Sequence, residues 1–447
     1  MNSHSEEHQP SPAGLDRISR IAFYATIILL PFRWRIELLA RPNGTLYRDY
    51  TDFLLFLPDI SLVVMLVAWW LSLRMDRKPV HLGPAAVWIP LAGLTFAGLF
   101  SVIFSVDRAL SLYHAIRFGL LFLFYLYVVN EKPSVSAVGI AVGFQGLIQS
   151  VVAIGQSLTQ RSVGLQLLGE YGLDPAWAGV SIVSNGVDRF LRAYGLADHP
   201  NILGGCLAFG MVFLLAVILH GEKKYRLLGA AVFVLMSAAL FFTFSRAAWL
   251  AFLAGSGLMI GVEAWLRRGE NVKAMFRLAV GSFIVLIPMS ITYQSLLGAR
   301  FNIGNSFEAI RAEAQSMDER AYLNDSANRI FVKHPLSGVG LSASPVAMKN
   351  EYPDFPTYYQ PPHFTLLAVA LETGIFGAAF YFLLMVLPWA VFLRRRDRWS
   401  NPHAIGAASL LLAVTVVGFF DYYTWFSPAG RLWQWLAWGL AAGAMEA

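Results

Sequence analysis

Residues 200–220 read PNILGGCLAFGMVFLLAVILH, a run that contains no acidic residue, lysine or arginine. A helix needs about 20 apolar residues to cross the hydrocarbon core of a bilayer. Backbone that lies in lipid must satisfy its hydrogen bonds within its own segment, and a helix does this. The run therefore predicts a membrane-spanning helix.

Similar apolar runs recur along the chain and are separated by short charged loops. The 447 residues are 57% hydrophobic and 14% charged, with a mean hydropathy of +0.55, and the alternation typical of barrel strands is absent. We predict an all-α polytopic membrane protein with about 12 transmembrane helices. The expected spans are residues 18–32, 53–73, 84–105, 110–129, 134–158, 200–220, 227–244, 247–266, 276–296, 375–393, 403–420 and 430–445.

Short basic loops fall between alternate spans, so they share one side of the membrane. These loops carry Arg74, Arg77, Lys78, Lys132, Lys223, Lys224, Arg226, Arg267, Arg268, Lys273, Arg394, Arg395, Arg396 and Arg398. The positive-inside rule makes that side cytoplasmic, and both termini with it. Residues 1–17 are expected to form a disordered cytoplasmic tail. Spans one to nine then occupy residues 18–296, a large helical outer loop residues 297–374, and spans ten to twelve residues 375–447.

The opposite side carries several arginines, against the orientation rule. Ordinary loop salt bridges are one explanation. An anion site is the other, because the planar guanidinium fork donates hydrogen bonds to phosphate in pairs. Within residues 317–333, Arg320 shares a helical face with Leu323, Ala327 and Ile330, while Arg329 lies on the opposite face. Arg320 is therefore the arginine of this segment that faces inward.

Further candidate side chains stand where outer loops enter spans. Arg189, Arg192 and Tyr194 precede Asp198-His199-Pro200-Asn201, Ser245 and Arg246 open the next such span, and His363 opens a helix that runs through Glu372. Asp198 and Ser245 are expected helix caps, and Arg189 and Arg192 would share a face if their segment is helical. Helix N-termini attract anions, so these three helix starts predict a site for a pyrophosphate with a base beside it.

Two histidines compete for the role of base. His363 and His199 both stand at helix starts, and an unperturbed pKa near 6.5 suits either for proton transfer. A cap or structural role is the alternative for both, and it is favoured for His199. Glu372 is either a ligand-site residue or a structural partner, since a carboxylate in a span needs pairing. The aromatic run 352–359 suits either sugar stacking or an interfacial belt.

Other motifs are absent from the sequence. It contains no GxxxxGK[ST], no strand-linked GxGxxG, no Asp-x-Asp pair and no HExxH. Nucleotide and dinucleotide chemistry are therefore disfavoured, and a metal site has no support. Cys206 is the single cysteine, which excludes an intramolecular disulfide.

The chain resembles the bacterial O-antigen ligase and polymerase superfamily, a family of membrane-embedded glycosyltransferases. The matching residues are Arg192, Gly195, Pro200 and Asn201 (Arg-x-x-Gly, then Pro-Asn); Thr243, Ser245 and Arg246 (Thr-x-Ser-Arg); Arg320 before His334, Pro335, Leu336, Gly338 and Gly340 (His-Pro-Leu-x-Gly-x-Gly); and His363 before Glu372 and Gly374 (Glu-x-Gly). The chain departs from the family at Phe364, where asparagine is frequent. A single long outer loop late in the chain resembles the ligases more than the polymerases.

The resemblance implies an inverting transfer that needs neither metal nor other cofactor. The donor would be O-antigen polysaccharide on undecaprenyl pyrophosphate, and the acceptor a sugar hydroxyl of lipid A–core oligosaccharide, at the periplasmic face of the inner membrane. Nucleotide and nucleic acid would take no part. His363, Arg192 and Arg246 are the expected catalytic residues. Expected substrate-binding residues are Arg189, Arg320, Tyr194, Asn201, Ser245 and Glu372.

Three alternatives stay open at the level of sequence. An O-antigen polymerase and a protein O-oligosaccharyltransferase would use the same donor chemistry with another acceptor. A lipid-linked sugar transporter would use a similar number of spans, although transporters often contain internal repeats and none is visible in this sequence.

Overall fold

The computed structural model describes residues 12–301, 303 and 307–446. The α-helices are α1 (Pro12–Leu29), α2 (Leu57–Asp76), α3 (Ala85–Ser101), α4 (Arg108–Glu131), α5 (Val135–Thr159), α6 (Pro200–His220), α7 (Arg226–Phe242), α8 (Arg246–Trp265), α9 (Gly269–Thr292), α10 (Gln294–Phe301), α11 (Phe307–Lys333), α12 (Ser344–Glu351), α13 (Thr365–Arg394), α14 (Pro402–Gly418), α15 (Tyr423–Phe426) and α16 (Pro428–Glu446). Short 3₁₀ helices are η1 (Arg48–Tyr50), η2 (Val102–Phe104), η3 (Gln166–Leu168), η4 (Lys223–Tyr225) and η5 (Arg396–Ser400).

The expected all-α membrane architecture is confirmed. Each expected span overlaps one long helix, and 9 helices of the described chain are long and apolar enough to cross a membrane. The expected spans at 18–32, 403–420 and 430–445 correspond to α1, α14 and α16, which do not meet those limits of length and composition. Helix α1 begins at Pro12, inside the segment expected to be a tail, while residues 1–11 lie outside the described residues.

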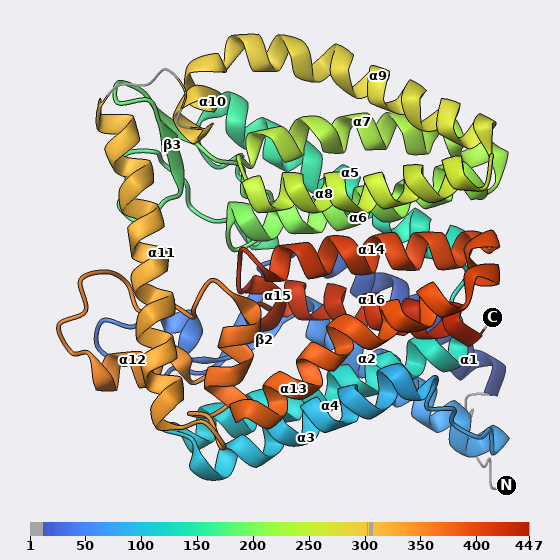
Figure 1. Ribbon diagram of the computed structural model, residues 1–447, viewed down its shortest axis with the longest axis horizontal. Coiled ribbons are helices and arrows are strands. Elements are labelled where there is room, and N and C mark those ends of the chain that lie inside the picture. Colours follow the sequence, from blue (N-terminus) through green and yellow to red (C-terminus); the bar gives the residue numbers. More distant parts are fainter. Residues whose placement is uncertain (1–11, 302, 304–306, 447) are drawn as a thin grey trace, which may run out of the picture.

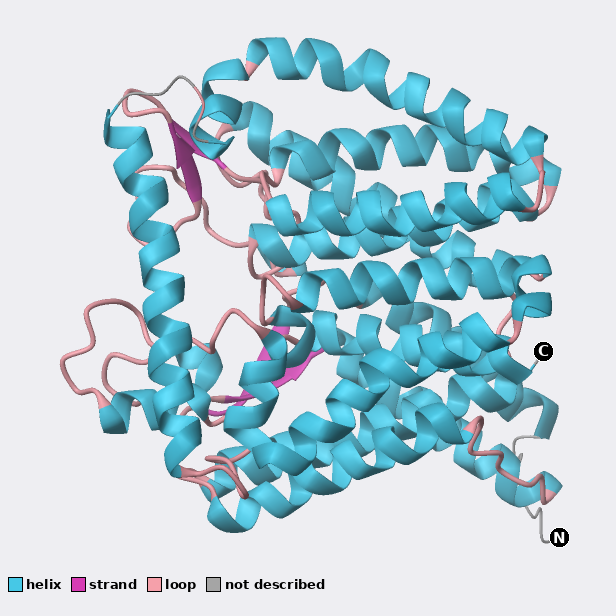
Figure 2. Cartoon of the chain, in the orientation of Figure 1, coloured by secondary structure: helices cyan, strands magenta, loops and turns pink. Residues whose placement is uncertain are grey.

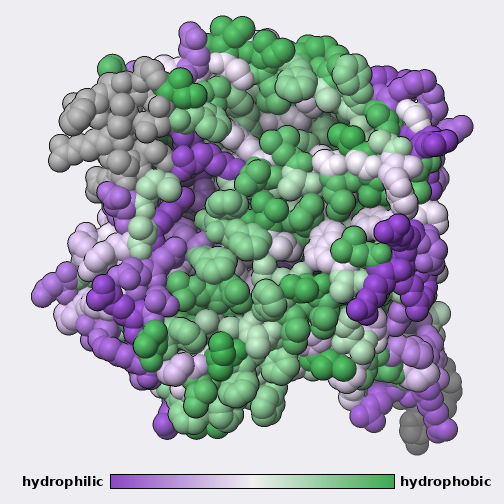
Figure 3. Space-filling view, in the orientation of Figure 1, coloured by the Kyte–Doolittle hydropathy of each residue, from purple (hydrophilic) through white to green (hydrophobic). Residues whose placement is uncertain are grey.

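The bundle has two polar ends and an apolar middle. Figure 1 shows both termini at one end and helix α11 lying across the other, perpendicular to the bundle helices. We call these the terminus end and the arm end. Figure 3 shows hydrophobic side chains over the middle and hydrophilic side chains at both ends. The expected cytoplasmic loops lie at the terminus end and the expected outer loops at the arm end, so the two sets of loops are separated in space.

Two small antiparallel sheets lie at the arm end (Figure 2). Strands β1 (Arg35–Leu39) and β2 (Phe53–Phe56) form one, and β3 (Ile182–Ser184) and β4 (Arg189–Leu191) form the other. In the second sheet Ser184 pairs with Arg189 and Ile182 with Leu191. This pairing ends immediately before Arg192 and so fixes where that residue leaves the sheet.

Helix α13 is interrupted at Gly374, where φ is 73°. The interruption leaves backbone groups without helical partners, and residues 335–340 supply them. The hydrogen bonds run from Val339 N to Leu371 O (2.8 Å), from Gly340 N to Glu372 O (3.0 Å) and from Ile375 N to Pro335 O (2.8 Å). A Cβ at Gly374 would lie 2.1 Å from Leu336 O, so a larger residue does not fit. The His-Pro-Leu-x-Gly-x-Gly motif and the Glu-x-Gly motif are thus hydrogen-bonded to each other through their backbones.

Candidate functional site

His363 lies at the arm end, just before α13. Its backbone N–H donates to Asn324 Oδ1 of α11 at 2.9 Å, which ties the start of α13 to the arm helix. Its ring is 13% exposed and packs edge-to-face on Tyr422, with ring centroids 5.0 Å apart. The next residue, Phe364, stacks on Phe419 instead of offering the amide that is frequent at this position of the family. The contact with Tyr422 and the hydrogen bond of the His363 backbone to Asn324 hold the histidine at the start of α13.

Asp421 is the carboxylate nearest to His363, and sequence reasoning missed it. Its Oδ1 lies 3.7 Å from His363 Nδ1, longer than a hydrogen bond. Its Oδ2 accepts from Asn201 Nδ2 at 2.8 Å, and it is 4% exposed. The sequence offered one indication of this role. Asp421 directly follows the apolar segment 403–420, and a carboxylate beside a span is costly unless it has a partner.

The imidazole of His363 is neutral at pH 7. Burial lowers the pKa of His363 to about 4, and the nearby Arg320 lowers it further, while Asp421 acts in the opposite direction. Desolvation is the largest of these effects because it penalises the charged form directly. A neutral imidazole retains a lone pair, so His363 is able to accept a proton at neutral pH.

Arg192 is a buried cation whose hydrogen-bond partners are all neutral. It is 5% exposed and donates to Thr243 O (2.7 Å), Ser181 Oγ (2.9 Å) and Asn201 Oδ1 (2.6 Å). Burial and the charge of Arg300 lower the pKa of Arg192 well below its usual range. Within the described residues no carboxylate pairs directly with Arg192, and the charge of Asp421 acts on it only as a smaller, opposing effect. A buried charge of this kind is costly, so this position favours an anionic ligand.

One hydrogen-bonded path connects Arg192 to the histidine side of the site. Asn201 accepts from Arg192 Nη2 through its side-chain oxygen and donates to Asp421 through its side-chain nitrogen. The path continues from Asp421 to His363 across 3.7 Å. Hydrogen bonds therefore join Arg192 to Asp421, and Asp421 lies close to the candidate base without a hydrogen bond to it.

The turn between α7 and α8 brings further arginines to this place. Phe244 lies in the left-handed region with φ at 47°, and its carbonyl accepts from Arg300 Nε at 2.9 Å. Arg246, in the first turn of α8, donates to Arg300 O at 3.2 Å. Ser245 occupies the N-cap position of α8 but makes no side-chain cap hydrogen bond, so the expected capping role was wrong. The backbone N–H of Ser245 instead donates to Thr243 Oγ1 at 3.3 Å within the turn.

Arg320 points to the site from α11. Leu323, Ala327 and Ile330 are buried as expected, which confirms the inward face of this helix. Burial is the largest cause of the lowered pKa values of Arg192, His199 and His363. The charge of Arg320 lowers all three pKa values further. Within the described chain, Arg320 makes no hydrogen bond or ion pair. By contrast Arg329, on the opposite face, is exposed and pairs with Asp325 at 2.9 Å.

Arg189 is not brought to this cluster. Its segment is strand β4, not a helix, so the condition for sharing a face with Arg192 does not hold. Its side chain is exposed, and Nε donates to Pro175 O at 2.9 Å.

Tyr194 and Glu372 make structural contacts. The hydroxyl of Tyr194 accepts from Ser181 N at 2.8 Å, which braces the loop that carries Arg192. Glu372 is fully buried and accepts from Ser342 N (2.8 Å), Ser344 Oγ (2.7 Å) and Trp425 Nε1 (2.8 Å). These three donors satisfy its carboxylate, so Glu372 fastens the loop after Gly340 to the broken helix.

His199 is the N-cap of α6, the structural role favoured for it. Its Nδ1 accepts from Asn201 N at 3.1 Å, and burial together with Arg192 lowers its pKa to about 3. Asp198, the expected cap, instead pairs with Arg33 (2.8 Å) and Arg35 (2.7 Å), so that expectation was wrong. The two ion pairs fasten the first outer loop beside the site.

The aromatic run at 352–359 is mostly packed on itself. Phe355 lies 5.3 Å from Tyr359 and 6.1 Å from Tyr352, measured between ring centroids, and these residues belong to a small core under α11. Tyr358 is the exposed member at 71%. Within the described ranges, no three His, Cys, Asp or Glu side chains come together as metal ligands.

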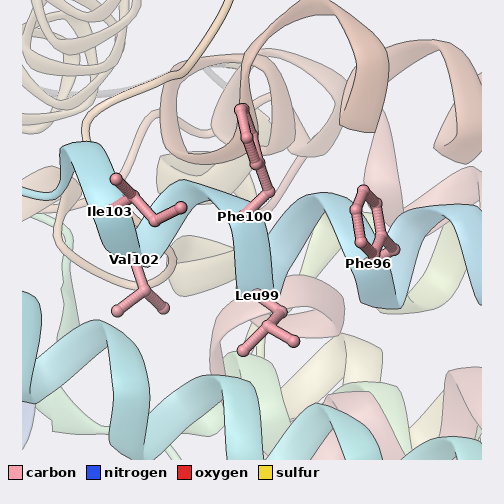
Figure 4. Close-up of a pocket in the computed structure, with 5 residues that line it drawn as sticks. All are labelled: Phe96, Leu99, Phe100, Val102 and Ile103. Carbon is pink, nitrogen blue, oxygen red and sulfur yellow. The ribbon is translucent and has the colours of Figure 1, made fainter.

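An apolar pocket lies at the C-terminal end of α3 and on η2 (Figure 4). It is lined by Phe96, Leu99, Phe100, Val102 and Ile103. Its lining carries no group able to bind phosphate or transfer a proton, so it is not the candidate site.

The fold and this site define an integral membrane protein with a cationic, histidine-containing site at one polar end. Residues 231–382 match the family model described as O-antigen ligase. The resemblance seen in the motifs is confirmed over this region, and the match supports a function of the O-antigen ligase and polymerase type. A search of curated proteins found no match. The matched region holds Arg246, Arg320 and His363, while Arg192 and Asp421 lie outside it.

Proposed function

We propose that this chain is an O-antigen ligase. It transfers O-antigen polysaccharide from undecaprenyl pyrophosphate to a sugar hydroxyl of lipid A–core oligosaccharide. The observation that carries the proposal is a neutral His363 beside Asp421, joined through Asn201 to the buried Arg192, whose hydrogen bonds within the described residues all go to neutral groups. A transfer from a lipid diphosphate needs these two things, a base for the acceptor and cations for the leaving group.

The arginines act on the donor. Arg192 and Arg246, with Arg320 reaching in from the arm, bind the diphosphate oxygens and stabilise the negative charge that grows as the sugar departs. Donors held in place before the reaction are commonly worth about 3–4 kcal/mol each in lowering a barrier. Arg189 lies apart in the structure and is left out of this set. Tyr194 and Glu372 support the site through the backbone N–H groups that they bind, and Ser245 lies in the turn before Arg246.

His363 acts on the acceptor. Because Nδ1 faces Asp421, a proton on Nδ1 leaves the Nε2 lone pair available for the acceptor hydroxyl. The acceptor oxygen then bonds to the anomeric carbon of the donor sugar while the bond from that carbon to the phosphate oxygen breaks. The hydroxyl proton moves to Nε2, and the electron pair leaves on the diphosphate. A single displacement of this kind inverts the anomeric configuration and uses only side chains of this chain.

The proposed orientation of the chain in the membrane rests on the basic loops at the terminus end and on the position of the candidate site at the arm end. The arm end is periplasmic in this proposal, and the terminus end, with its basic loops, is cytoplasmic. Residues 297–374 then form the periplasmic part that carries His363, between nine spans before it and three after it. A lipid-linked donor reaches the site from the bilayer because Arg246 stands in the first turn of α8 and Arg192 lies shortly before α6, two of the membrane-spanning helices.

Deleting the gene should leave lipid A–core uncapped while lipid-linked O-antigen polymer accumulates. The reason is that synthesis of the polymer continues and only its transfer stops. The measurement is gel separation of lipopolysaccharide, together with extraction of the lipid-linked polymer, in the deletion strain and in the strain complemented with the wild-type chain. Caps of a single repeat would indicate a polymerase instead. Normal caps with loss of a glycoprotein would indicate a protein acceptor.

A further inference from the structure

Arg300 stands beside Arg192 because consecutive carbonyl oxygens hold the two side chains. Thr243 O accepts from Arg192 Nε at 2.7 Å, and Phe244 O accepts from Arg300 Nε at 2.9 Å. The two side chains are thus anchored on consecutive residues of one turn, and the charge of Arg300 acts on Arg192. The sequence motifs include Arg192 but not Arg300.

Three elements fix the position of Arg300. Helix α10 packs its buried Leu296 and Ala299 against the bundle, and the carbonyl of Arg300 itself accepts from Arg246 Nη1 at 3.2 Å. The side chain then reaches the α7–α8 turn. A helix surface held in this way keeps its arginine in one direction instead of leaving it to solvent.

The charge of Arg300 acts on the groups around it. Among neighbouring charges, that of Arg300 acts most strongly on Arg192, and it lowers the pKa of Arg192 in addition to burial. It also contributes to the lowered pKa of His199. Two like charges held together on one turn repel each other, and an anion between them removes that repulsion.

We infer that Arg192 and Arg300 form a two-arginine clamp that selects a diphosphate over a monophosphate. Arg300 is anchored through Nε, and Arg192 through one N–H of each of its three nitrogens, which leaves one N–H on each Nη of Arg192 for a ligand. A guanidinium is a planar group that pairs with one phosphate group. Two forks fixed side by side match two linked phosphates, whereas a single phosphate fully occupies only one. The inference rests on the proposed function and adds Arg300 to the residues that bind the donor.

The test compares farnesyl diphosphate with farnesyl monophosphate as soluble probes of the purified full-length chain in detergent, by titration calorimetry. Arg300→Ala should weaken diphosphate binding about 10- to 100-fold, the usual worth of a hydrogen bond to a charged group. Monophosphate binding should change by less than about threefold, because Arg192 still serves one phosphate. Arg300→Lys should give an intermediate loss, since lysine restores the charge without the fork.

Controls separate this inference from the proposed function. Arg329→Ala, on the exposed face of α11, should bind both probes as the wild type does. Arg300→Gln keeps a hydrogen-bond donor for Phe244 O, so it reports on the charge if Arg300→Ala fails to fold. Equal losses for both probes, or unchanged diphosphate binding, would overturn the clamp. If Arg192→Ala also leaves diphosphate binding unchanged, the proposed phosphate site itself fails.

Discussion

Replacing His363 by alanine should lower the rate of transfer by about 100- to 10,000-fold, the usual contribution of a general base. The loss is expected in the chemical step, because the imidazole takes the acceptor proton and does not bind the diphosphate. Donor binding by His363→Ala should therefore stay close to that of the wild type. The measurements are the initial rate of product formation and the affinity for lipid-linked donor, at equal amounts of folded protein.

Two controls distinguish a base from a structural histidine. His363→Asn keeps a polar side chain of similar reach but cannot accept the proton at neutral pH, so near-normal activity in this variant would contradict the proposed role. The pH profile is the second control. Protonation removes the lone pair, and the pKa of His363 is lowered to about 4, so the rate should persist below pH 6 and fall as pH approaches that value. A fall centred near 6.5 would point to an exposed histidine.

Replacing Arg192 by alanine should lower the rate by about 100- to 1,000-fold, through the loss of charge stabilisation at the departing diphosphate. Arg192 is expected to have the largest effect among the arginines because it is buried and because Asn201 links it to Asp421. Arg192→Lys should rescue little, since lysine cannot reproduce three hydrogen bonds made by a planar fork. The measurement is kcat/KM for the lipid-linked donor.

A buried arginine also supports the fold, so stability must be measured beside activity. Loss of its bonds to Thr243 and Ser181 should lower the thermal midpoint, and Asn201→Ala gives a matched variant that breaks one of the three bonds while keeping the charge. Arg329→Ala should change neither quantity. A folded Arg192→Ala protein with kcat/KM within about threefold of the wild type would exclude Arg192 from leaving-group stabilisation.

Local pattern was sufficient to predict the all-α membrane architecture and one helix face. The uncharged run at 200–220 is helix α6 at the same residues, and Arg320 and Arg329 lie on the two faces that their spacing indicates. Hydrophobic content and helical periodicity are local properties, so they can be recognised in a single sequence without knowledge of the fold. Local pattern did not predict the strand at residues 189–191. That strand depends on pairing with residues 182–184, and pairing is not a local property.

The candidate site could be predicted only in part, because its decisive contacts join distant parts of the chain. Asn201 and Asp421 are 220 positions apart, and Arg192 and Thr243 are 51 apart. No single sequence states that Asp421 lies beside His363, or that α10 returns Arg300 to the α7–α8 turn. The glycines at 338, 340 and 374 likewise acquire their meaning only when the loop meets the broken helix.

The most direct test of the account is transfer by the purified chain, reconstituted in liposomes with undecaprenyl pyrophosphate-linked O-antigen and lipid A–core. The account predicts that O-antigen appears on lipid A–core with release of undecaprenyl pyrophosphate, that the new linkage is inverted, and that EDTA leaves the rate unchanged. Growth of the lipid-linked polymer without any transfer to lipid A–core, or activity that EDTA abolishes and a divalent ion restores, would contradict it.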